Sequence, residues 1–154
     1  MPAYHPQGEN LMHLARWQFL AAAAALLVTA CAQMPQMPWS GAPRIALSGA
    51  QEVPPLATRA SGSATIAVAA DRSVSGSVVT SGMRGVAAQI HQGASGRNGP
   101  VVMTLEMTGE NTWKVPAGAR LTTAQYTAYK KGNLYVNVRS AAHLDGEIRG
   151  QIQP

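Results

Sequence analysis

The feature that most constrains this fold is the alternation of apolar and polar residues along residues 132–152. The segment Ser140–Gly146 interrupts the alternation, which predicts two strands joined by a short loop, that is, a β-hairpin. A period of two places every second side chain on the same face of a strand. The apolar residues expected to share one face are Leu134, Val136, Val138, Ile148 and Ile152. We therefore expect this hairpin to frame whatever site the protein has.

The same period recurs along the preceding part of the chain. It predicts strands over residues 44–48, 63–69, 74–80, 86–91 and 101–107. In the fourth of these, Val86, Ala88 and Ile90 are expected on one face. Gln89 and His91 then share the opposite face, which makes them candidates for a binding site.

Two of the connecting segments carry their own signals. Pro54 and Pro55 exclude a central strand over residues 49–55. Glu52 in this segment is a candidate site carboxylate, but a solvated loop residue is the favoured interpretation. The glycine-rich segment 93–100 precedes a strand rather than a helix. It therefore lacks the helix N-terminus of a phosphate-binding loop, and a flexible surface loop is the better interpretation.

One short helix is predicted over Thr123–Lys131, directly before the C-terminal hairpin. Thr122 and Gln125 have the spacing of a capping box, in which each residue satisfies a free backbone amide of the other. Two lysines occupy the last turn, where they favour the helix dipole. Gly132 follows them and can adopt the left-handed conformation that ends a helix.

Composition limits the fold and the partners. A chain of 154 residues allows one domain of ordinary size, and its single cysteine excludes a disulfide scaffold. The formal charge is +5, but only 12% of residues are charged and the basic ones are scattered, which argues against nucleic-acid binding. These patterns predict an all-β fold, an antiparallel sandwich or barrel of about seven short strands with one short helix.

The N-terminal region predicts where in the cell the protein is located. The apolar run Phe19–Ala30 is shorter than the roughly 20 residues that a membrane-spanning helix needs, and it matches the centre of a secretory signal. Val28–Cys31 resembles the lipobox of bacterial lipoproteins, in which the cysteine is lipidated and becomes the N-terminus. More than one acyl chain makes such an anchor stable. Ala32, in place of an aspartate, favours the outer membrane, facing either the periplasm or the outside.

The predicted organisation therefore has three parts. Residues 1–30 are a signal peptide, residues 31–43 are the lipidated Cys31 with a proline-rich tether, and residues 44–154 are the β-domain. The first eleven residues are unlike the start of a signal peptide, so both Met1 and Met12 stay open as the start of translation.

Three segments resemble the CHRD domain, which is named from chordin and also occurs in bacterial secreted proteins: Leu47–Pro55, Ile90–Val102 and Leu121–Ile152. The resemblance covers residues 44–153 and implies an immunoglobulin-like β-sandwich or barrel in an extracytoplasmic setting. In chordin that setting is extracellular growth-factor antagonism. For the bacterial members the resemblance implies no general activity.

Two departures from the family pattern concern candidate ligands. Family members often have His-x-His where this chain has Gln89 to His91, and Asn-Val-His where it has Asn137 to Arg139. An arginine is a permanent cation without a free lone pair, so Arg139 cannot ligate a metal. Gln89 is at best a weak oxygen ligand. Two imidazoles of a family cluster are thus replaced in this chain.

The favoured function is a non-catalytic binding module that presents the loops 92–99 and 140–147 to an unidentified envelope protein or glycan. The candidate binding residues are Gln89, His91, Arg139, His143, Asp145 and Glu147. Arg149 is expected to pair with a carboxylate, either Glu147 or Glu52.

Two alternatives use the same residues. A copper or zinc site could be built on His91 and His143, with carboxylates nearby as further donors. A hydrolase could use Ser140, His143 and Asp145, but three residues on one tight loop seldom align as a catalytic triad, so we do not expect an enzyme.

Overall fold

The computed structural model describes residues 1, 3 and 41–154. The expected signal peptide, the lipidation site Cys31 and most of the tether lie outside the described residues. The chain divides into two units, Met1–Pro35 and Gln36–Pro154, and the second unit contains the β-domain. No helix within the described residues is long and apolar enough to cross a membrane.

The domain consists mainly of strands. They are β1 (Arg44–Ser48), β2 (Ser61–Val68), β3 (Val74–Ser81), β4 (Gly85–Gln92), β5 (Val101–Thr104), β6 (Glu106–Gly109), β7 (Thr112–Lys114), β8 (Leu134–Ser140) and β9 (Ile148–Ile152). A 3₁₀ turn, η1 (Gly49–Gln51), follows β1, and the helix α1 (Thr123–Lys130) precedes β8. The prediction of an all-β antiparallel fold is confirmed, with nine strands in place of about seven.

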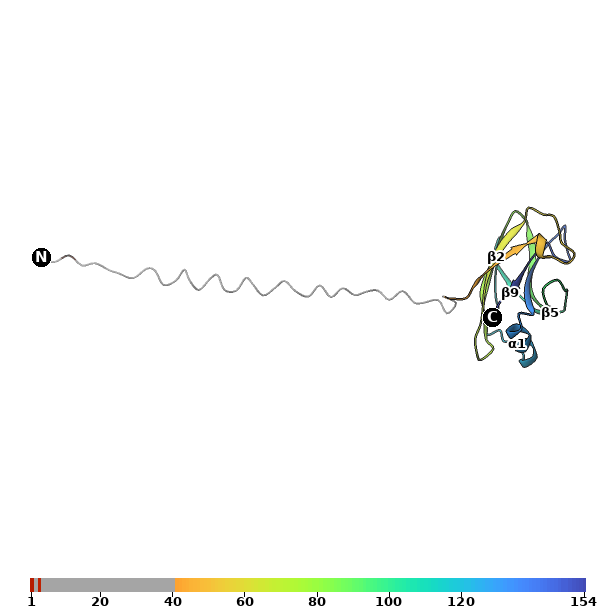
Figure 1. Ribbon diagram of the computed structural model, residues 1–154. Helices are drawn as coiled ribbons and strands as arrows, with labels where there is room; N and C mark the ends of the chain where they lie inside the picture. Colours follow the sequence, from red (N-terminus) through yellow and green to blue (C-terminus); the bar gives the residue numbers. More distant parts are fainter. Residues whose placement is uncertain (2, 4–40) are drawn as a thin grey trace. The chain divides into compact units, whose positions relative to one another are not determined.

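All nine strands belong to one antiparallel sheet with the order β5-β4-β8-β9-β1-β2-β3-β7-β6. Its two edge strands, β5 and β6, follow each other along the chain and are separated only by Leu105. Residues so close in the chain can lie at opposite edges only if the sheet curls back on itself. The result is a nearly closed barrel, with α1 at one end of it (Figure 1).

The change of sheet edge at Leu105 corrects the prediction of one strand over residues 101–107. β5 pairs with β4, whereas β6 pairs with β7. Leu105 itself is buried, and its amide donates a hydrogen bond to the carbonyl of Ala88 at 2.9 Å. Alternation detects an extended segment but carries no information about its partner strand, so the change of partner could not be seen in the sequence.

The core occupies the inner face of the curled sheet. The predicted apolar face of β8 and β9 is confirmed, since every member of it is fully buried there. Trp113 is 1% exposed and fills the space beside Gly85, where an added Cβ would collide with the indole ring. Val86 was expected in the core but is 48% exposed, because the β4–β8 register shifts between Gly85 and Ala87. The bulge turns Val86 outwards.

The predicted helix and its capping box are confirmed. The Thr122 hydroxyl oxygen accepts from the Gln125 amide at 3.2 Å, and the Gln125 side-chain oxygen accepts from the Thr122 amide at 2.8 Å. Gly132 adopts a φ of 69°, in the left-handed region. The helix therefore begins and ends where the local chemistry dictates, and it leads directly into β8.

Thr122→Ala is expected to lower the free energy of unfolding by about 1 kcal/mol, because it leaves an amide of the first helical turn without its acceptor. Thr122→Ser keeps that acceptor and should stay close to the parent protein. Urea denaturation of the three proteins measures the difference. An equal loss in both variants would mean that the cap does not stabilise the domain.

Candidate functional site

The second, polar face of the β4-β8-β9 region is also largely covered. The register aligns Gln89 of β4 with Asn137 of β8, and Asn137 with Arg149 of β9. A second row crosses the same three strands. His91 of β4 is aligned with Tyr135 of β8, and Tyr135 is aligned with Gln151 of β9. Most of these polar side chains are nevertheless buried, among them His91, Asn137 and Arg149. Something other than the sheet must therefore cover this face.

Two loops provide the cover. The first runs from η1 through the two prolines, and the second is the segment 93–100. Asn98 of the second loop donates from its side chain to the carbonyl of Val53 in the first, at 2.8 Å, and so joins them. The segment 93–100 is thus a surface loop, as predicted, that also covers a polar site.

Arg149 lies at the centre of the covered face and is 1% exposed. Its guanidinium carbon lies 3.5 Å from the centre of the Tyr135 ring, a cation–π contact. It donates to the carbonyl of Ala94 at 3.0 Å and to the side-chain oxygen of Gln151 at 3.2 Å. The expected ion pair is absent, since no carboxylate of the described residues lies within 4.0 Å of it. Arg149 is a buried cation held by an aromatic ring and neutral oxygens.

Glu52 faces the same region, and its burial corrects the prediction of a solvated side chain. It is 7% exposed, because η1 folds the loop back over β8. The Asn137 side-chain amide donates to both carboxylate oxygens, at 3.1 Å and 3.2 Å. Burial raises the pKa of Glu52 from 4.5 to about 7, although Arg149 and the hydrogen bonds from Val53 and Asn137 act in the opposite direction. Near neutral pH this carboxyl exchanges a proton.

A cavity of about 360 Å³ opens between the two loops. Its lining residues are Ala50, Gln51, Glu52, Val53, Pro55, Ser95, Gly96, Arg149 and Gln151. The cavity thus combines a buried cation with a carboxyl group that titrates near neutrality. From the sequence, Glu52 was considered as a site carboxylate but expected to be solvated, and Arg149 was expected only to pair with a carboxylate. A signal for Arg149 was available, because the alternation places it with Glu147 and Gln151 on the polar face of its strand.

His91 lies on β4, on the side of Tyr135 that is away from Gln151. The two rings stack with centres 5.0 Å apart, and His91 Nδ1 lies 2.9 Å from the carbonyl oxygen of Gly99. A carbonyl only accepts, so Nδ1 carries the proton and Nε2 presents a lone pair. Nε2 is buried and has no hydrogen-bond partner. Burial lowers the pKa of His91, and the nearby Arg139 and Arg149 lower it further.

The candidate residues Gln89 of β4 and Arg139 of β8 lie on the same face of the sheet as His91. Arg139 is aligned with Ala87, two residues before Gln89 on β4. Gln89 donates from its side-chain amide to the Thr104 hydroxyl at 3.1 Å. Its other terminal atom, Oε1, is buried without a partner, as are Asn137 Oδ1 and Arg139 Nε. The positions where the family often has histidine are therefore neighbours in space. In this chain they present one imidazole, one amide and one guanidinium.

The other candidate residues lie on the loop between β8 and β9. His91 pairs with Tyr135, whereas His143 lies beyond Ser140, at the far end of β8. Tyr135 and Ser140 are five residues apart on β8, which corresponds to roughly 17 Å along the strand. The structure therefore does not bring His91 and His143 together around one ion. Among the described residues, no group of three or more histidine, cysteine, aspartate and glutamate side chains is arranged to hold a metal.

The side chains of this loop stabilise it. His143 donates from its backbone amide to the Ser140 hydroxyl at 3.3 Å, and Asp145 is exposed. The Thr58 hydroxyl donates to the buried Glu147 carboxylate at 2.7 Å. Burial by itself would raise the pKa of Glu147, but hydrogen bonds from Ser140 and Thr58, together with nearby His143, outweigh it and lower the pKa. Ser140 thus closes the loop through a local hydrogen bond, whereas Glu147 ties the loop to Thr58.

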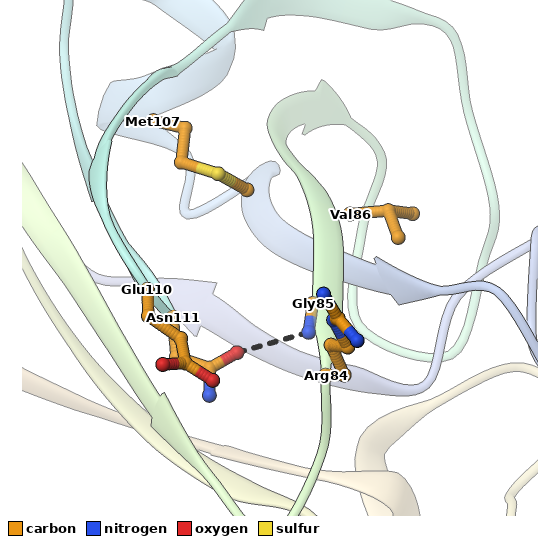
Figure 2. Close-up of a pocket in the computed structure, with 6 residues that line it drawn as sticks. All are labelled: Arg84, Gly85, Val86, Met107, Glu110 and Asn111. Atoms are coloured by element: carbon orange, nitrogen blue, oxygen red, sulfur yellow. Dashed lines mark hydrogen bonds between the residues drawn. The ribbon is translucent and has the colours of Figure 1, made fainter.

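A second cavity, of about 540 Å³, lies between the start of β4 and the β6–β7 hairpin. Figure 2 shows its lining residues Arg84, Gly85, Val86, Met107, Glu110 and Asn111. The dashed line in Figure 2 marks the hydrogen bond from the Gly85 amide to the Asn111 side-chain oxygen, at 2.9 Å. This contact ties the start of β4 to the turn between β6 and β7. None of the predicted site residues lines this cavity.

Comparison with known proteins supports a family assignment for the domain. Searches of curated proteins and of solved structures gave no match. The sequence model of the CHRD domain matches residues 44–152, which is all but the ends of the described β-domain. The motifs noted in the sequence lie within this match. They form the end of β1 with the loop after it, the end of β4 with the covering loop, and α1 with the β8–β9 hairpin. The chain belongs to the CHRD domain family.

Proposed function

We propose that this protein is a lipid-anchored binding module of the bacterial cell envelope, held at the outer membrane by Cys31 and without catalytic activity of its own. The observation that carries the binding role is the loop-covered cavity, because buried Arg149 and Glu52 both line it. Pockets that bind small groups typically combine a preformed concave shape with a few fixed polar side chains. The partner is an envelope protein or a glycan.

The anchoring part of the proposal rests on the sequence before the β-domain. The apolar run Phe19–Ala30 and the lipobox resemblance at Val28–Cys31 are the supporting features. The domain family adds support, since CHRD domains are expected in extracytoplasmic settings. Residues 32–43 would then separate the domain from the membrane surface.

Replacing Cys31 tests whether a lipid on this residue holds the protein at the membrane. In a bacterial host, Cys31→Ser is expected to lose the mass of the acyl chains and to move from the membrane fraction to the soluble envelope fraction. Intact mass measurement and membrane fractionation provide the two readouts. Retention of an acylated, membrane-bound protein in Cys31→Ser would contradict lipid anchoring at this residue.

Photo-crosslinking in intact cells tests the binding role. A crosslinking side chain placed at Ser95, which is exposed and lines the cavity, should give a specific adduct. The same side chain at Thr108, exposed on β6 and outside this cavity, should not. Identical adducts at both positions, or none at Ser95, would contradict a binding role for the cavity.

A further inference from the structure

We propose that the cavity between the two loops binds a carboxylate group, with the guanidinium of Arg149 as its cationic partner. This inference rests on the proposed binding function and names the chemistry of the ligand. The source of the carboxylate is either a free small acid or an acidic sugar of a glycan.

The first argument is the electrostatic state of Arg149. A buried charge is costly unless it is paired, and this guanidinium has neutral oxygens and an aromatic ring as its contacts. Its remaining contact, to the side-chain oxygen of Asn98, is long at 3.4 Å. An incoming carboxylate would supply the missing negative charge, and arginine is the side chain best suited to pair with a planar carboxylate.

The second argument is the position of Arg149 in the cavity wall. It lines the cavity together with Gln151, whose side-chain amide is already committed to the carbonyls of Gly93 and Gly132. Ser95 and Gly96 line the same space and are exposed. A volume of about 360 Å³ accommodates a group the size of a single sugar acid, but not a folded segment of protein.

The protonation state of the Glu52 carboxyl controls whether the cavity binds a second carboxylate. When it is ionised it competes for Arg149 and repels a second carboxylate, whereas its protonated form does neither. Arg149 from β9 is the charged group that acts on it, while β8 contributes the neutral Asn137 amide. From the β8–β9 loop, the Gly146 backbone packs against Glu52, and the next residue, Glu147, is engaged by Thr58. Binding should therefore be coupled to uptake of one proton from solvent by Glu52.

Calorimetric titration of the detergent-purified full-length protein with glucuronate tests this inference. Because Glu52 has a pKa of about 7, the affinity for glucuronate should be about tenfold higher at pH 6 than at pH 8. Acetate should show the same pH dependence if a free acid is sufficient, and only glucuronate should bind if the sugar is required. No heat with glucuronate at pH 6 would overturn the inference, as would equal binding of glucose or of inorganic phosphate.

Glu52→Gln provides the decisive variant, because glutamine imitates the protonated carboxyl. It should bind glucuronate equally well at pH 6 and pH 8, with the affinity of the parent protein at pH 6. Glu106→Gln removes the same charge from exposed β6 and should keep the tenfold difference. A tenfold difference that persists in Glu52→Gln would overturn the inference. If glucuronate fails to bind while acylation at Cys31 and the adduct at Ser95 are both seen, this inference alone is overturned.

Discussion

Glu52→Gln is expected to raise the free energy of unfolding by about 2 kcal/mol at pH 8 and by less than about 1 kcal/mol at pH 5. The stabilisation arises because the loop holds this carboxyl under cover, at 7% exposure, beside the Asn137 amide. At pH 8 the parent protein must keep a negative charge there, whereas the variant keeps a neutral amide of the same shape. Urea denaturation at the two pH values measures both differences.

The direction follows from proton binding in the two states. The pKa of Glu52 is about 7 in the folded protein and 4.5 when the chain is exposed, so between these values the folded state binds more protons. The contribution of Glu52 to stability is fully present below pH 4.5 and is lost as the pH rises through 7. The full shift corresponds to roughly 3 kcal/mol, and screening by solvent at the mouth of the cavity reduces it.

A matched substitution separates this effect from a general change in charge. Glu106→Gln also removes one carboxylate, but from a strand whose residues are all exposed, and should change stability by less than about 0.5 kcal/mol at either pH. An equal gain for Glu52→Gln at pH 5 and pH 8 would show that the proton on this residue is not the cause.

The elements that the sequence predicted well are those whose signals are local. The alternation of Leu134, Val136 and Val138 is a property of one strand, and the capping box of Thr122 and Gln125 spans one helical turn. Both therefore appear in the structure where they were expected. The family motifs likewise predicted the β-fold, because they extend over most of the domain.

The site was harder to predict because its contacts are not local. Glu52 and Asn137 are 85 residues apart in the chain, and nothing near Glu52 indicates that its loop will cover β8. Alternation also divides a strand into two faces without saying whether the polar face meets water. In this domain that face is covered, and Arg149 therefore contacts Tyr135 and backbone carbonyls instead of a carboxylate.

The candidate metal site illustrates a different limit. The metal hypothesis needed His91, from the predicted strand 86–91, to lie close to His143 in the hairpin loop, and alternation alone gives no register between the two strands. Once β4 and β8 are aligned, His91 faces Tyr135 and His143 lies past the far end of the strand. Gln89 lies two residues from His91 on β4, and Arg139 of β8 is aligned with Ala87, two residues further along. The family comparison had already marked both positions as departures. The chemistry of these positions differs from that of the family because glutamine and arginine replace histidine, not because the strands are arranged differently.

Arg149→Met is expected to lower the free energy of unfolding by roughly 3 kcal/mol at pH 7, the largest effect among these predictions. Methionine fills a similar volume, but it leaves the carbonyl of Ala94 and the side-chain oxygen of Gln151 without their donor. It also removes the cation from the face of Tyr135, a contact worth up to about 2 kcal/mol when it is desolvated. Urea denaturation of the domain measures the loss.

Arg149→Lys distinguishes the charge of this residue from its shape. Lysine keeps the positive charge near Glu52, but it cannot lie flat on the Tyr135 ring while donating to two oxygens in different directions. If the planar contacts dominate, as the 3.5 Å stacking distance suggests, lysine should lose most of what methionine loses. Stability close to that of the parent protein would instead assign the effect to charge alone. A loss below 1 kcal/mol for methionine would contradict the central structural role given to Arg149.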